Sequence, residues 1–309
     1  MKRLLIFLLL TYVMSTVYDM TWAQVQDDYF EVIVSKGDNF VRTEQNEWEK
    51  VKIGTGIFAG DELKTSASGY VALLFAKSKL VELKHIQPKT YKFEELVDLV
   101  PKLEQGLATQ FLNYLLSKMA PESREANRNT YIQLIAATER GHEEIALFID
   151  TNANLYSSNA VIRWDPSKNA GGYVVTLKHI FEDVIRIFDT EKPYFELDFN
   201  DEAIKGKSIV IINVSLKNDI ETASGDYAIQ RIDETDAEIS SKLKELESVL
   251  DPESPFSHLI IAEFFEQNEL LLDALTRYEY AIRQNPGVDY FNDAYLEFLM
   301  RNKYTDKID

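Results

Sequence analysis

The sequence contains no cysteine, and only four of its 309 residues are histidine. The lack of cysteine excludes disulfide bonds, thiolate metal sites, cysteine nucleophiles and a lipid-modified N-terminal cysteine. No histidine lies within helical or strand reach of another, and no zinc-protease motif is present. His142 precedes Glu143-Glu144, but it follows Gly141 in a polar stretch that favours a solvated loop. We therefore predict no cofactor and no metal site. The histidines are His85, His142, His179 and His258.

Long apolar runs are equally scarce, and the main one lies at the N-terminus. Lys2 and Arg3 precede an apolar stretch, 4–17, and Thr21 and Ala23 place small residues where a signal peptidase reads. The stretch is roughly 15 residues, shorter than the ~20 that a bilayer requires, which favours a cleaved signal over an uncleaved anchor. We expect residues 1–23 to be removed, leaving a periplasmic or secreted chain that is not an integral membrane protein.

Positive charge is also in short supply. The chain has 33 lysines and arginines against 51 acidic residues, a formal net charge of −18. A field of this sign repels nucleic acid and anionic lipid surfaces. Nucleic acid is therefore not an expected partner, whereas neutral or basic protein partners fit the charge.

Residues 24–93 read as short strands separated by turns. Apolar and polar residues alternate, and the string Gly60-Asp61-x-Leu63-x-Thr65 follows a glycine-rich bend. We predict that Gly60 makes the bend, Asp61 caps it and Leu63 enters the core. The string resembles the hallmark of the FecR-type domain, a β-rich module of bacterial envelope proteins. The resemblance implies an envelope location and a role accessory to sensing; a direct anti-sigma role is not expected, since no mid-chain spanning segment is evident.

Two further segments follow. Residues 94–142 carry an amphipathic stripe and predict a helical connector, with a turn at 94–100 and a helix near 102–119 that Pro121 ends. Residues 143–232 predict about seven strands of a β-sandwich. Trp164 and Tyr173 give this segment a resemblance to fibronectin type III domains. The predicted strands are 145–149, 161–164, 173–177, 184–188, 194–197, 209–214 and 227–231.

Residues 236–309 predict a small array of about four helices. Small, aromatic and proline residues recur there at the spacing of a tetratricopeptide repeat, which this segment resembles. The resemblance implies a concave groove for a peptide, and Asn268, Arg277 and Gln284 are the polar positions that we expect to face a partner. The positions that carry the resemblance are Ile261-Ala262, Phe265, Ala274, Tyr278, Ala281 and Pro286.

Catalytic patterns are weak throughout. The acidic clusters Asp27-Asp28 and Asp198 with Asp201-Glu202 lie where turns expose charge, and no Gly-x-Ser-x-Gly elbow occurs. Trp48 and Trp164 suit core packing better than a carbohydrate platform. The sequence thus predicts an α+β multidomain, non-enzymatic, exported bacterial interaction or scaffold protein of the cell envelope. The alternative is a carbohydrate- or peptidoglycan-associated binding protein or weak glycosidase, which requires aromatics such as Trp48 on an exposed face.

Overall fold

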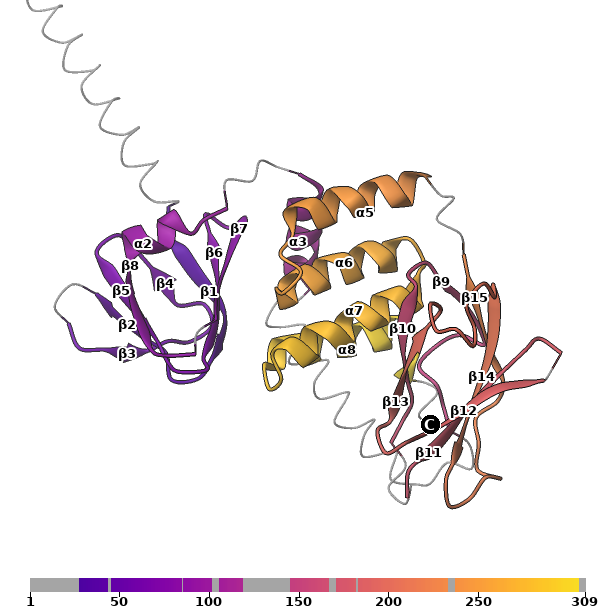
Figure 1. The fold of residues 1–309 in the computed structure, drawn as a ribbon. Helices are drawn as coiled ribbons and strands as arrows, with labels where there is room; N and C mark the ends of the chain where they lie inside the picture. The colour runs from indigo at the N-terminus through magenta and orange to yellow at the C-terminus, as the bar shows by residue number, and fades with distance from the viewer. Residues whose placement is uncertain are drawn as a thin grey trace, which may run out of the picture. The chain divides into compact units, whose positions relative to one another are not determined.

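The computed structural model describes residues 28–43, 46–84, 86–101, 106–118, 145–166, 171–181, 183–232 and 237–305. The fold is mixed α+β, and the chain divides into two compact units, Met1–Glu104 and Gln105–Asp309 (Figure 1). The predicted signal peptide lies outside the described residues. In the ranges that are described, no helix is long and apolar enough to cross a bilayer.

The first unit consists of two four-stranded sheets and a short helix. The sheet orders are β4-β1-β6-β7 and β3-β2-β5-β8, and all pairings are antiparallel. Side chains from both sheets and from the helix share one core, which includes Phe30, Leu63 and Val71. The elements are β1 (Phe30–Lys36), β2 (Phe40–Thr43), β3 (Glu49–Lys50), β4 (Gly56–Ile57), β5 (Asp61–Thr65), β6 (Tyr70–Phe75), β7 (Lys79–Lys84), β8 (Lys89–Lys92) and α2 (Phe93–Asp98).

The turn before β5 has the predicted architecture. Gly60 has φ +93°, in the left-handed region that glycine tolerates, and the buried Asp61 carboxylate accepts the Phe58 N–H at 2.9 Å. Leu63 is fully buried. The roles expected of Gly60, Asp61 and Leu63 are therefore confirmed. Asn39, which the sequence analysis missed, accepts the Ser66 N–H at 2.9 Å and so joins two turns.

The β6–β7 hairpin is closed by two non-glycine residues in the left-handed region. Ala76 has φ +47° and Lys77 has φ +58°, and Ser78 N–H donates to the Phe75 carbonyl at 3.1 Å. Left-handed backbone costs residues with a Cβ roughly 1–2 kcal/mol each. The hairpin is thus strained at Ala76 and Lys77.

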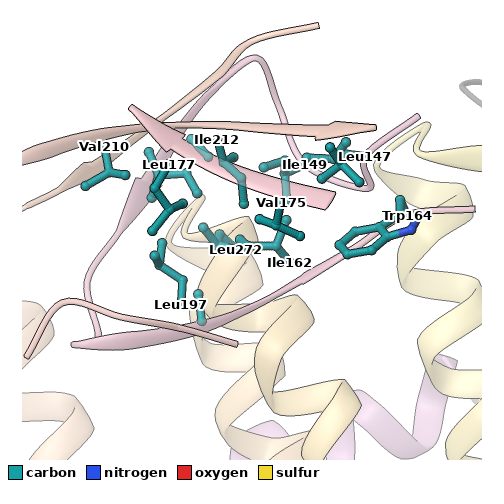
Figure 2. Packing of buried hydrophobic residues seen from close by; sticks show 14 of the residues in the cluster. Leu147, Ile149, Ile162, Trp164, Val175, Leu177, Leu197, Val210, Ile212 and Leu272 are labelled. Carbon is teal, nitrogen blue, oxygen red and sulfur yellow. The ribbon is translucent and has the colours of Figure 1, made fainter. Parts of the chain in front are cut away.

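The second unit contains a five-stranded sheet, order β12-β11-β14-β15-β9, and a two-stranded sheet, β10-β13. Neighbouring strands are antiparallel except β15 and β9, which are parallel. The inner faces of both sheets bury one apolar cluster (Figure 2). The strands are β9 (Asn152–Leu155), β10 (Asn159–Arg163), β11 (Tyr173–Lys178), β12 (Val184–Thr190), β13 (Tyr194–Asp198), β14 (Ile209–Leu216) and β15 (Tyr227–Arg231).

Six of the seven predicted strands match observed strands, and the one at 145–149 does not. That segment forms a single bridge, Leu147 to Trp164, while its apolar side chains still enter the core. The strand beside β15 is instead β9, whose sequence Asn-Ala-Asn-Leu has poor β-propensity. Tertiary packing stabilises β9 as a strand, because the side chains of Ala153 and Leu155 enter the apolar core.

The helices of this unit are α3 (Leu107–Lys118), α5 (Ala237–Val249), α6 (Pro255–Gln267), α7 (Leu271–Gln284) and α8 (Asp289–Arg301). The last four are the helices predicted in 236–309. The small residues Ala262, Ala274 and Ala281 are fully buried, as close helix packing requires. Within 94–142, the turn expected at 94–100 is wrong: 93–98 is helix α2, whose Glu95 accepts the Lys92 N–H. The helix expected near 102–119 is α3, and residues 119–144 lie outside the described residues.

Candidate functional site

One face of α7 is bonded directly to the β-sheets. The Asp273 carboxylate accepts the backbone N–H groups of Tyr156 and Ser157, each at 2.8 Å. Thr276 Oγ1 accepts the Val161 N–H at 3.0 Å and donates to the Leu272 carbonyl at 2.8 Å. Leu272 itself belongs to the core of the sheets (Figure 2). Helix α7 therefore completes the sheet core and satisfies backbone N–H groups of β10 and of the turn between β9 and β10.

Burial governs the electrostatics of this seam. Desolvation raises the pKa of Asp273, although its bonds to Ser157 and Tyr156 and the charge of Arg277 oppose the shift. Nearly two turns after Asp273 on α7, the buried Glu279 forms an ion pair with Arg163 of β10, with Arg163 Nη2 donating at 2.7 Å. Such pairing offsets the desolvation of Glu279. We call the contacts of Asp273, Thr276 and Glu279 with β9, β10 and the turn between them the α7 seam.

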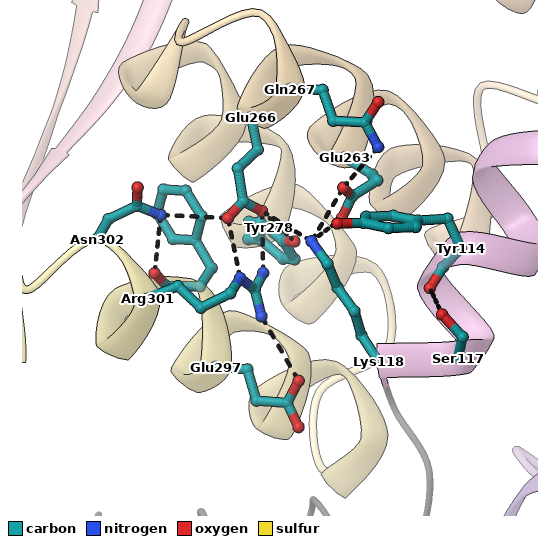
Figure 3. Close-up of polar contacts among 11 residues, drawn as sticks. Tyr114, Ser117, Lys118, Glu263, Glu266, Gln267, Tyr278, Glu297, Arg301 and Asn302 are labelled. Carbon is teal, nitrogen blue, oxygen red and sulfur yellow. Dashed lines mark hydrogen bonds and ion pairs between the residues drawn. The ribbon is translucent and has the colours of Figure 1, made fainter.

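A second polar network joins α3, α6 and α8. Glu263, which is fully buried, accepts both of its bonds to Lys118 Nζ at 3.0 Å (Figure 3). The Glu266 carboxylate accepts hydrogen bonds from Arg301 Nε at 3.0 Å and from Arg301 Nη2 at 2.9 Å, which makes the pair bidentate. Burial would raise the pKa of Glu266, but Arg301 and Lys118 lower it below its ordinary value. Each carboxylate of this network is thus held by a cation, an arrangement that fixes helices rather than activating a nucleophile.

The three predicted partner-binding residues all make contacts within the chain. Asn268 ends α6 and donates to the Phe264 carbonyl at 2.7 Å. Arg277 approaches Glu247 of α5 at 3.6 Å. Gln284 Nε2 lies 3.0 Å from His258 Nε2 and 3.3 Å from the Pro252 carbonyl oxygen. Arg277 and Gln284 share one face of α7, whereas Asn268 lies at the far end of α6, so the structure does not bring all three together.

His258 is the buried histidine of this region. Its ring contacts Tyr280 edge-on, with ring centroids 5.7 Å apart. Desolvation, followed by the charge of Arg277, lowers the pKa of His258 to about 4. The neutral ring accepts a hydrogen bond from the Gln284 amide. His258 is therefore a neutral packing residue near pH 7.

The acidic clusters occupy the turns that were expected of them. At the end of β13, Asp198 accepts the Asn200 N–H at 2.8 Å, and in the turn that follows Asp201 accepts the Ala203 N–H at 2.9 Å. Asp28 is exposed, and Asp27 lies outside the described residues. Across the part of the chain that the structure describes, no group of three or more histidine or acidic side chains is arranged to hold a metal ion.

The tryptophans differ in burial. Trp164 is fully buried and meets Tyr173 edge-on at 5.1 Å between ring centroids, which confirms its predicted core position. The same prediction is wrong for Trp48. That ring is partly exposed, with the Arg42 guanidinium carbon 4.6 Å and Lys64 Nζ 5.8 Å from its centroid. Cation–π contacts explain why the ring lies on the sheet's outer surface.

The comparisons with known proteins add no relative: no protein-family model and no curated protein matches the sequence. The residues that define the α7 seam were missed by the sequence analysis, although one signal was available. Asp273, Thr276 and Glu279 recur three apart on a helix whose other inward positions are apolar, so they mark one polar stripe.

Proposed function

We propose that this protein is a non-enzymatic interaction protein of the bacterial cell envelope, exported by residues 1–23 and accessory to sensing. In this proposal the first unit is a FecR-like module, the sheets of the second unit are a fibronectin III-like sandwich, and α6 with α7 is a tetratricopeptide-like hairpin. The partner is an envelope protein or peptide.

The α7 seam is the observation that carries the proposal. Its buried carboxylates accept hydrogen bonds from backbone amides and from an arginine, and these bonds join α7 to the sheets. The sequence separation between Asp273 and Tyr156 is 117 residues. Contacts of this range support a preorganised scaffold, which lowers the entropy lost when a partner binds.

The seam also dictates how the proposal is tested. Removing 236–309 would take Leu272 out of the sheet core, so a deletion would confuse unfolding with loss of binding. The full mature chain should instead be immobilised and exposed to an envelope extract of the producing bacterium. We expect specific envelope proteins to be retained. Retention of none, or turnover of peptidoglycan fragments by the purified chain, would contradict the proposal.

A point variant tests whether Arg277 of α7 contacts the partner. Arg277→Gln should reduce partner retention if Arg277 faces the partner, whereas Lys242→Gln, a matched loss of one cation on α5, should not. Equal retention by both variants would remove Arg277 from the interface. N-terminal sequencing of exported protein should begin at Gln24; a membrane fraction that retains Met1 would overturn the export prediction.

The partial exposure of Trp48 meets the requirement of the carbohydrate-binding alternative for an accessible aromatic ring. An aromatic face beside Arg42 and Lys64 suits an anionic sugar. Pelleting with insoluble peptidoglycan tests it. The alternative expects Trp48→Ala to abolish pelleting, while Phe58→Ala, which truncates another exposed aromatic of the same unit, retains it. No pelleting of the unsubstituted chain would dismiss this alternative.

A further inference from the structure

The strand β12 forms an open edge of the five-stranded sheet. It pairs with β11 alone, from Tyr173 opposite Thr190 to Lys178 opposite Val184. Among the described residues, no backbone group outside β11 bonds to the backbone of 184–190. Its seven residues include no proline, which commonly blunts an edge, and its pairing with β11 shifts register at Ile185, between Val184 and Arg186. Beyond that shift, from Arg186 to Thr190, the strand presents a free row of donors and acceptors.

The other edge strand of the same sheet, β9, is shorter. It has four residues, and Ile232 N–H, just after β15, extends the β9–β15 pairing by donating to the Leu155 carbonyl at 2.9 Å. The next residues along the chain donate to Asp273 of α7. Figure 1 shows β9 beside the helices, whereas the β11–β12 hairpin extends away from them. The two edges therefore differ: β9 is short and lies beside the helices, whereas β12 is longer and lies away from them.

The β12 edge also carries apolar side chains in water. Phe181 at the hairpin tip is 82% exposed and Ile187 is 57% exposed, and Ile180 and Val184 are exposed by a similar fraction to Ile187. Ile187 and Val184 lie opposite Thr176 and Lys178, on the outer face of the sheet. Exposed apolar residues grouped on one hairpin indicate an interaction surface.

The charges near this edge favour a basic partner. Arg186 is paired with Asp201 at 3.1 Å, and Lys217 with Asp189 at 2.6 Å. Lys178 is likewise paired, with Asp226 at 3.0 Å, and Lys192 lies over the Tyr194 ring. Exposed carboxylates of Asp183, Glu191 and Glu202 add negative charge, and the whole chain carries −18. A cationic segment would gain from this field.

We propose that an extended, lysine- or arginine-rich segment of a partner protein adds to β12 as a sixth strand. Main-chain bonds along 184–190 supply affinity, and apolar side chains of the segment cover Val184 and Ile187. The exposed carboxylates of Asp183 and Glu191, directly before and after β12, attract cations of the segment. This inference rests on the proposed interaction function and names the surface and the partner's chemistry.

The probe is an acetylated and amidated eight-residue peptide of alternating lysine and valine, labelled with a fluorophore. Full mature protein should bind it, and hydrogen exchange should slow at 184–190. Ile187→Lys should weaken binding at least about tenfold, because a charge on an exposed edge blocks strand addition. The control Ile220→Lys adds the same charge at another exposed apolar residue and should leave the affinity within about twofold.

Three outcomes would overturn the inference. One is equal binding by Ile187→Lys and Ile220→Lys; another is equal binding of a peptide whose alternate backbone amides are methylated. The third is a dimer in sedimentation that Ile187→Lys abolishes, since the occupant of β12 would then be a second copy. If envelope partners are retained by the Ile187→Lys variant as well, the inference fails while the proposed interaction function stands.

Discussion

The carboxylate of Asp273 in α7 accepts the N–H of Tyr156 after β9 at 2.8 Å, and this bond ties the C-terminal helices to the sheets. Asp273→Ala would leave that buried amide and the partly buried Ser157 amide without an acceptor. We expect the free energy of unfolding to fall by about 3 kcal/mol. Asp273→Asn keeps one carbonyl oxygen and should cost less. Urea denaturation measures both.

The matched control for this prediction is Glu245→Ala, which removes an exposed carboxylate from α5. Its effect should stay within about 0.5 kcal/mol. Equal costs for Asp273→Ala and Glu245→Ala would show that the Asp273 bonds contribute nothing to stability.

The Lys118–Glu263 pair predicts a non-additive result. Lys118→Met leaves the fully buried Glu263 without its cation and should cost about 3 kcal/mol. Lys118→Met with Glu263→Leu removes both charges and should recover part of that loss. A double-mutant cycle by urea denaturation gives the coupling energy. Additive costs would mean that the pair does not hold α3 to α6 energetically.

The β6–β7 turn predicts a stabilising substitution. Replacing Ala76 and Lys77 with Asn and Gly supplies residues that favour positive φ at both positions. The free energy of unfolding of the first unit should rise by about 1 kcal/mol. Thermal denaturation followed by tyrosine and tryptophan signals tests it. A lowered midpoint would contradict the strained turn geometry.

His258 predicts a pH dependence of stability. Its pKa is lowered from 6.5 to about 4 in the fold, so between these values the unfolded chain binds the proton and the folded chain does not. The contribution of His258 to stability is complete above pH 6.5 and falls as the pH drops toward 4, by up to about 3 kcal/mol. His258→Gln should reduce the slope of unfolding free energy against pH in this window. An unchanged slope would show that His258 titrates normally.

Local features of the fold were largely predictable. Gly60 and Asp61 follow from turn chemistry, and the strand from Tyr227 to Arg231 follows from alternation, because both depend on neighbours in sequence. β9 was missed and 145–149 was misassigned, because those outcomes depend on contacts with β15 and Trp164. The sequence-based prediction failed where tertiary contacts overrode propensity.

The candidate site was less predictable for the same reason. A helical template places Asn268, Arg277 and Gln284 on a helix pair, but it cannot show that α3 and the sheets already contact that pair. Trp48 shows the limit for aromatics: a tryptophan in a β-rich segment suits a core, yet its contact with Arg42 holds it at the surface. Only the spatial arrangement distinguishes these two placements.

Hydrogen exchange of the full mature chain, with and without Asp273→Ala, tests most directly whether helices and sheets form one scaffold. The account predicts that the substitution lowers the opening free energies of amides in α7 and in β10 by the same amount. Faster exchange confined to α7, with β10 unchanged, would contradict it.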